Sequence, residues 1–124
     1  MQQIQEQVFK QCPSCRRIWN DYTDFLADPC LRLIGYQVLF ENLRDGLFLF
    51  NHSCGTTLAI TVENLQHLHK GPVFRERVTG SKSCPGLCLI PDETSPCSAK
   101  CECAYVRSIM QTIKRWRKKT RRGC

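Results

Sequence analysis

Residues 47–62 read LFLFNHSCGTTLAITV, two apolar segments on either side of a short polar turn. The first segment, 47–50, is continuously apolar, and 58–62 is a second strand candidate; both are typical of strands that pack against a core. The turn between them carries His52 and Cys54, and Gly55 permits the left-handed backbone that such a tip needs. The stretch therefore predicts a β-hairpin with two metal-ligand candidates at its tip.

A further strand is expected before this hairpin. Tyr36, Val38 and Phe40 alternate with their neighbours at the period of two that marks a strand, and residues 42–46 form a turn. The order of these segments predicts a three-stranded antiparallel β-meander.

Short helices are expected on both sides of the meander. Residues 1–11 and 63–70 have helical patterns, and Trp19, Tyr22 and Phe25 lie three residues apart, as on one face of a helix.

A longer amphipathic helix is expected over residues 96–119, because apolar side chains recur there at steps of three and four. They are Tyr105, Val106, Ile109, Met110, Ile113 and Trp116. The chain is therefore predicted to be a small, metal-stabilised α+β protein. Residues 1–80 would hold a knuckle and the meander, and residues 81–124 a cysteine-rich lobe with the C-terminal helix, together one compact unit.

Ten of the 124 residues are cysteines, a density that indicates a framework held by disulfides or metal. The N-terminus lacks a positive region followed by an apolar stretch, and no run is long enough to cross a bilayer, so a cytoplasmic location is expected. Thiols stay reduced there, which favours metal ligands over disulfides. In a secreted protein, five disulfides would be the competing interpretation.

The first predicted metal site begins with the sequence Cys-Pro-Ser-Cys at residues 12–15. Two residues between cysteines let the backbone fold into a knuckle that supplies half of a tetrahedral shell, Cys12 and Cys15. Cys54 and His52 are the expected suppliers of the other half, with Cys30 or a water as alternatives to His52 for the fourth ligand. A redox-active dithiol is the main rival interpretation of this pair.

Residues 12–15 and 52–55 together resemble a zinc ribbon, a family in which a Cys-Pro-x-Cys knuckle pairs with a second knuckle on a β-hairpin. The second half here reads His-Ser-Cys-Gly rather than Cys-x-x-Cys. The resemblance implies one zinc ion between the two segments.

The second predicted site lies in residues 84–103, where five thiols fall in a stretch with few apolar side chains. A loop pair and a pair at i, i+4 on the expected helix would complete a four-sulfur shell for Zn²⁺, with the fifth cysteine as an alternative ligand. An iron–sulfur cluster is the alternative cofactor. The ligand candidates are Cys84, Cys88, Cys97, Cys101 and Cys103.

The net charge of +7 is concentrated in residues 114–122, which hold seven of the eighteen basic residues and no acidic one. Such a run is typical of contact with nucleic acid or, less favoured here, an anionic membrane surface; it is also compatible with a solvated tail or with a protein partner. The contact candidates are Lys114, Arg115, Trp116, Arg117, Lys118, Lys119, Arg121 and Arg122.

Three segments, 35–37, 48–54 and 101–107, also resemble a set of small uncharacterised bacterial cysteine-rich proteins. That resemblance implies a compact cytosolic metal-binding protein and no particular activity. No Ser/His/Asp arrangement or phosphate-binding glycine loop indicates an enzyme. The predicted function is therefore a zinc-binding interaction or regulatory module. An iron–sulfur redox or sensor protein is the alternative, and a thiol oxidoreductase using Cys12 and Cys15 is the third candidate.

Overall fold

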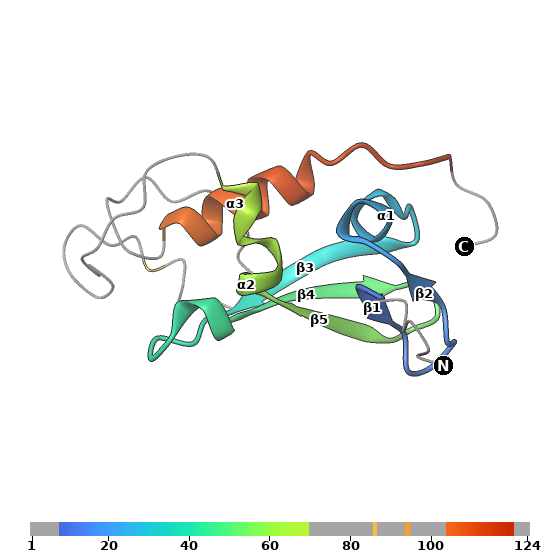
Figure 1. Ribbon diagram of the computed structural model, residues 1–124, viewed down its shortest axis with the longest axis horizontal. Helices are drawn as coiled ribbons and strands as arrows, with labels where there is room; N and C mark the ends of the chain where they lie inside the picture. Colours follow the sequence, from blue (N-terminus) through green and yellow to red (C-terminus); the bar gives the residue numbers. More distant parts are fainter. Residues whose placement is uncertain (1–7, 70–85, 87–93, 95–103, 121–124) are drawn as a thin grey trace, which may run out of the picture.

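The computed structural model describes residues 8–69, 86, 94 and 104–120. A three-stranded antiparallel meander, in the order β3-β4-β5, forms the centre of the fold, and a short hairpin, β1-β2, lies beside it (Figure 1). The strands are β1 (Lys10–Gln11), β2 (Ile18–Trp19), β3 (Leu31–Gln37), β4 (Leu47–His52) and β5 (Thr57–Thr61). The predicted α+β class and the meander are confirmed.

The helices are short, except for the last one. They are α1 (Tyr22–Ala27), the 3₁₀ turn η1 (Leu43–Asp45), α2 (Val62–Leu65), the 3₁₀ turn η2 (Gln66–Leu68) and α3 (Ala104–Lys114). Asp21 caps the N-terminus of α1, where its carboxylate accepts a hydrogen bond from the backbone N–H of Asp24 at 2.8 Å.

One face of the meander carries the core. Phe48 pairs with Ile60 and Phe50 pairs with Leu58, and all four side chains are buried. Because side chains alternate between the two faces of a strand, these residues lie on the same face of the sheet. The three α-helices pack their buried residues into this same cluster: Phe25 and Leu26 from α1, Val62 and Leu65 from α2, and Val106, Ile109, Met110 and Ile113 from α3.

Two helical predictions at the N-terminal end were wrong. Lys10 and Gln11 form β1 rather than the end of a helix, and Trp19 belongs to β2, where it pairs with Lys10. Trp19 is nevertheless fully buried, with its ring 5.1 Å from that of Phe25. Trp19 and Phe25 therefore meet in the core from two different kinds of element.

Two boundaries also differ from the prediction. The first meander strand begins at Leu31 and ends at Gln37, so the alternating residues 38–40 lie beyond it, and Leu39 is exposed. The last helix ends at Lys114, and residues 116–120 continue as a non-helical segment. The part of the predicted helix before residue 104 lies outside the described residues.

A buried carboxylate closes the turn between α1 and β3. Asp28 is only 3% exposed and accepts hydrogen bonds from Trp19 Nε1 at 2.8 Å and Arg17 Nε at 2.9 Å through Oδ2, and from the backbone N–H of Cys30 at 2.7 Å through Oδ1. Burial alone would raise the pKa of Asp28, but these hydrogen bonds and the charge of Arg17 hold it below its usual value.

We expect Asp28→Asn to lower the free energy of unfolding at neutral pH by about 2 kcal/mol, because a hydrogen-bonded charge partner of Arg17 is lost. A carboxylate whose pKa is lowered by folding stabilises the fold at pH values above the pKa that it has in the unfolded chain. This contribution disappears as the pH falls below about 4. The difference between wild type and variant should therefore narrow in acid. Urea unfolding of both proteins across this pH range measures it.

Asp45→Asn is the matched control. Asp45 is exposed and accepts one hydrogen bond from Asn42 at the other end of the sheet, so a change below about 0.5 kcal/mol is expected. If Asp28→Asn and Asp45→Asn lowered the free energy of unfolding equally and with the same pH dependence, Asp28 would have no special role.

Candidate metal centre

The first two candidate ligands lie in the turn that joins β1 to β2. The backbone N–H of Cys12 donates to the carbonyl of Arg17 at 2.9 Å, and the N–H of Arg16 donates back to the carbonyl of Cys12 at 3.0 Å. Arg16 has φ of 66°, a left-handed conformation that reverses the chain just after Cys15. These bonds form a compact knuckle that holds both thiols on one side of the turn.

The other two candidate ligands lie in the turn between β4 and β5. His52 is the last residue of β4; its N–H donates to the carbonyl of Thr56, and the N–H of Gly55 donates to the carbonyl of His52, both at 2.9 Å. Gly55 has φ of +94°, and a Cβ built on it would meet nothing within 4 Å. The glycine is therefore required by the backbone conformation of the tip and not by lack of space.

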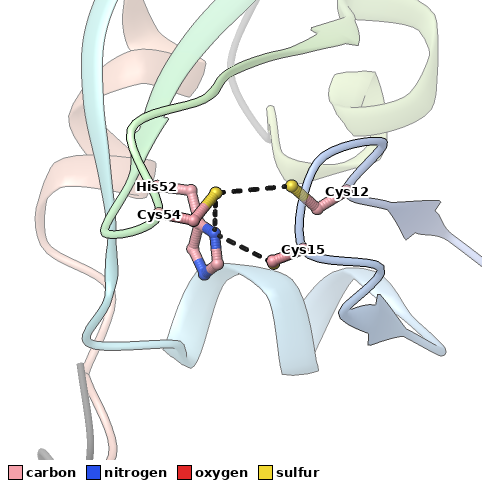
Figure 2. A group of neighbouring side chains, drawn as sticks. All are labelled: Cys12, Cys15, His52 and Cys54. Atoms are coloured by element: carbon pink, nitrogen blue, oxygen red, sulfur yellow. Dashed lines mark hydrogen bonds between the residues drawn. The ribbon is translucent and has the colours of Figure 1, made fainter.

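The two turns bring four ligand atoms together (Figure 2). The sulfurs of Cys12, Cys15 and Cys54 and a ring nitrogen of His52 all lie within 4.8 Å of one another. Cys12 Sγ is 3.6 Å from Cys54 Sγ, and His52 Nδ1 is 3.7 Å from Cys15 Sγ and 3.1 Å from Cys54 Sγ. In a tetrahedral zinc site, ordinary bond lengths place two sulfurs about 3.8 Å apart and a sulfur and nitrogen about 3.6 Å apart. The cluster could therefore hold a metal ion.

The imidazole of His52 is oriented by its surroundings. It is buried, and the ring of Trp19 meets it edge-on with the ring centroids 5.3 Å apart. Trp19 is in turn fixed by its hydrogen bond to Asp28. On the other side of the tip, the backbone N–H of Ser53 donates to the carbonyl of Cys30 at 3.0 Å. The side chain that presents Nδ1 to the sulfurs is thus supported by Trp19 in β2, and its turn by Cys30 just before β3.

The centre has one buried and one open side. Cys12 is completely buried, whereas Cys15 and Cys54 are exposed and border a surface hollow of about 490 Å³. Arg17 and Lys119 also line this hollow. A ligand or reagent can therefore reach two of the three sulfurs.

The metal-free thiols differ in acidity. The hydrogen bond between the Cys54 sulfur and the Thr56 hydroxyl, followed by one with His52, lowers the pKa of Cys54 to about 6. At Cys15 a hydrogen bond from the backbone of Arg17 acts in the same direction, but burial and the neighbouring sulfurs of Cys12 and Cys54 raise the pKa overall. Of the two exposed thiols, Cys54 therefore has the larger thiolate fraction near neutral pH.

Other sequence-predicted ligands are not part of this cluster. Cys30 is disulfide-bonded, so its sulfur is not a donor here, whereas Cys12, Cys15 and Cys54 are free thiols. The second predicted site, Cys84, Cys88, Cys97, Cys101 and Cys103, lies outside the described residues.

Three supporting residues were missed in the sequence. Thr56 follows Cys54 at a spacing that could have indicated a hydroxyl near the thiol. Trp19 and Asp28 gave no such signal, because their contacts depend on how β2 and α1 pack together.

No known protein family matches the chain, and no curated protein or solved structure shows significant similarity to it. In the described part of the chain, no helix combines the length and the apolar character needed to cross a membrane. The metal-binding interpretation therefore depends on the geometry of the four side chains.

We expect iodoacetamide to modify Cys54 before Cys15 in the reduced, metal-free protein at about pH 7, because the thiolate is the reacting form. Thr56→Val should slow the reaction of Cys54, since it removes the hydroxyl but keeps a similar shape. Peptide mass spectrometry at short reaction times measures both rates. Equal rates for the two cysteines, unaffected by the substitution, would contradict the assigned hydrogen bond.

Proposed function

We propose that the chain is a zinc-binding module in which one Zn²⁺ joins the β1-β2 turn to the β4-β5 turn. The observation that supports this is the convergence of three thiols and one imidazole nitrogen at distances close to the edges of a tetrahedron. Three sulfurs and one nitrogen form a ligand set that suits zinc.

The proposed role of the zinc is structural. Four protein ligands close a tetrahedral shell, whereas catalytic zinc sites keep a position open for water or substrate. The strands β1 and β2 have only two residues each, and an isolated hairpin is marginal in water even when it is longer. Bound zinc supplies on the order of 10 kcal/mol of folding free energy in small domains, enough to hold such a hairpin in place.

A thiol oxidoreductase is less well supported by this geometry. A dithiol enzyme needs an exposed cysteine with a lowered pKa in its Cys-x-x-Cys pair. Here Cys12 is fully buried, and the pKa of the exposed Cys15 is raised. An iron–sulfur cluster or a second zinc in the 84–103 stretch would use cysteines outside the described residues and stays a prediction.

Replacing a ligand should remove one equivalent of zinc. We expect Cys12→Ser and His52→Ala each to bind one equivalent less than the wild type, because a three-ligand shell binds zinc far more weakly. Elemental analysis of the purified proteins gives the difference, and this difference is independent of metal bound by other cysteines. Cobalt substitution adds a second readout, since the sulfur-to-cobalt absorption should weaken in Cys12→Ser.

His67→Ala is the control for His52→Ala. The ring of His67 packs against Tyr22 and is not in the cluster, so its loss should leave the zinc content unchanged. Unchanged zinc in all three variants would refute the site. Iron in place of zinc in the wild type would refute the assignment of the metal.

A second, separate proposal concerns the basic tail. Lys114, Arg115 and Arg117 are exposed and lie close together in the sequence, so they are the described cations best able to contact the phosphates of nucleic acid. Lys118 and Lys119 are engaged with α1 and β3 instead. Arg121 and Arg122 lie outside the described residues.

If these three cations contact phosphates, the affinity for duplex DNA should fall with salt at a log–log slope of about −2 to −3 or steeper. The double substitution Arg115→Gln/Arg117→Gln should reduce the slope by about two, whereas Arg44→Gln, at the far end of the sheet, should not. Filter binding or fluorescence anisotropy at several salt concentrations measures this. Binding that is insensitive to salt would exclude the proposed contact.

A further inference from the structure

The segment after α3, residues 115–120, continues in the direction of α3 and passes beside α1 (Figure 1). The backbone N–H of Lys119 donates to the carbonyl of Ala27 at 2.8 Å. The ammonium of Lys118 is partly buried and donates to the carbonyls of Leu26 at 2.7 Å and Leu31 at 3.2 Å. The last carbonyls of a helix lack partners within it and carry partial negative charge, so a lysine is well suited to this position.

The turn that receives this segment, residues 27–31, is also held by the metal centre. The carbonyl of Cys30 accepts a hydrogen bond from the N–H of Ser53, which lies between the ligands His52 and Cys54. From the other hairpin, Trp19 donates to Asp28 in the same turn. The turn therefore contacts both halves of the metal centre on one side and the C-terminal segment on the other.

The charges in this region support the same arrangement. Lys119 Nζ lies 3.2 Å from the carboxylate of Asp24, and Arg17 Nε lies 2.9 Å from that of Asp28. Both cations line the hollow beside the exposed sulfurs of the metal centre. With zinc bound, three thiolates and one Zn²⁺ carry a net charge of −1, which Arg17 and Lys119 complement.

We infer that zinc binding at the Cys12/Cys15/His52/Cys54 cluster and docking of residues 115–120 on the 27–31 turn are coupled. The inference rests on the proposed function of the cluster. Zinc fixes the two hairpin tips, the tips fix the turn, and the turn presents the Leu31 carbonyl to Lys118 and the Ala27 carbonyl to Lys119. By thermodynamic linkage, the factor by which zinc strengthens docking equals the factor by which docking strengthens zinc binding.

Amide hydrogen exchange of the full-length protein tests one direction of this coupling. The measurement uses ¹⁵N-labelled protein with a phosphine reductant, so that the Cys30 disulfide does not contribute. Adding Zn²⁺ should slow exchange of the Lys119 amide by about fivefold or more, the lower end of typical couplings. The amide of Gly46, which donates to Leu43 at the far end of β4, is the control and should slow much less.

The zinc affinity of variants in the C-terminal segment tests the other direction, the effect of docking on zinc binding. Lys118→Met keeps the apolar stem but loses the hydrogen bonds to Leu26 and Leu31, so zinc should bind about threefold or more weakly in competition with a chelator. Arg117→Met removes the same charge from an exposed neighbouring position and is the matched control. If only the long-range effect of the lost charge mattered, the zinc affinity would change equally in the two variants.

The outcomes separate this inference from the proposed function. Failure of the wild type to bind zinc at the cluster would refute both. Zinc binding with unchanged exchange of Lys119, or with equal affinities in Lys118→Met and Arg117→Met, would refute the coupling alone. The coupling would be supported if zinc slowed amide exchange more at Lys119 than at Gly46, and if zinc bound more weakly to Lys118→Met but not to Arg117→Met.

Discussion

The carboxylate of Asp28 is the interaction on which the described arrangement depends. Its oxygens accept hydrogen bonds from Trp19 and Arg17 in the N-terminal hairpin and from the amide of Cys30 just before β3. A buried charge without such partners costs several kcal/mol, so the carboxylate favours only the arrangement in which all three donors are present. The hairpin that carries Cys12 and Cys15 is thereby positioned by the same group that closes the turn into the sheet.

The candidate metal centre could be predicted to a large extent because its signals are local. A Cys-x-x-Cys turn and a His-x-Cys hairpin tip are each encoded in four or five consecutive residues, and both form turns in the structure. The tip also lies between two strands with strong apolar patterns, so its place in the meander followed from the sequence. The sequence did not reveal which imidazole nitrogen faces the sulfurs, or that Cys30 is disulfide-bonded, because both depend on distant packing.

The errors in the fold have specific physical causes. In β3, a bulge between Leu33 and Gly35 shifts the register by one residue, so the alternation expected of a strand is interrupted inside it. The uninterrupted alternation at residues 38–40 then indicated a strand in the wrong place. Trp19 has the helical spacing with Phe25 that led to its assignment to a helix, yet it reaches Phe25 from β2. Residue spacing therefore did not determine the path of the backbone.

The basic tail shows that composition alone does not predict which groups the charged side chains contact. A run of like charges indicates repulsion and exposure, but it does not reveal which backbone carbonyls lie within reach. Lys118 finds two of them at the end of α1 and the start of β3, where burial lowers its pKa and the charge of Asp28 partly offsets this effect. The described protein thus has two parts that are stabilised differently. Apolar packing holds α3 against the sheet, whereas charges, hydrogen bonds and the proposed metal hold the hairpin tips and the tail. The second part is the one in which binding chemistry can change structure, because a single charge or ligand there connects several segments.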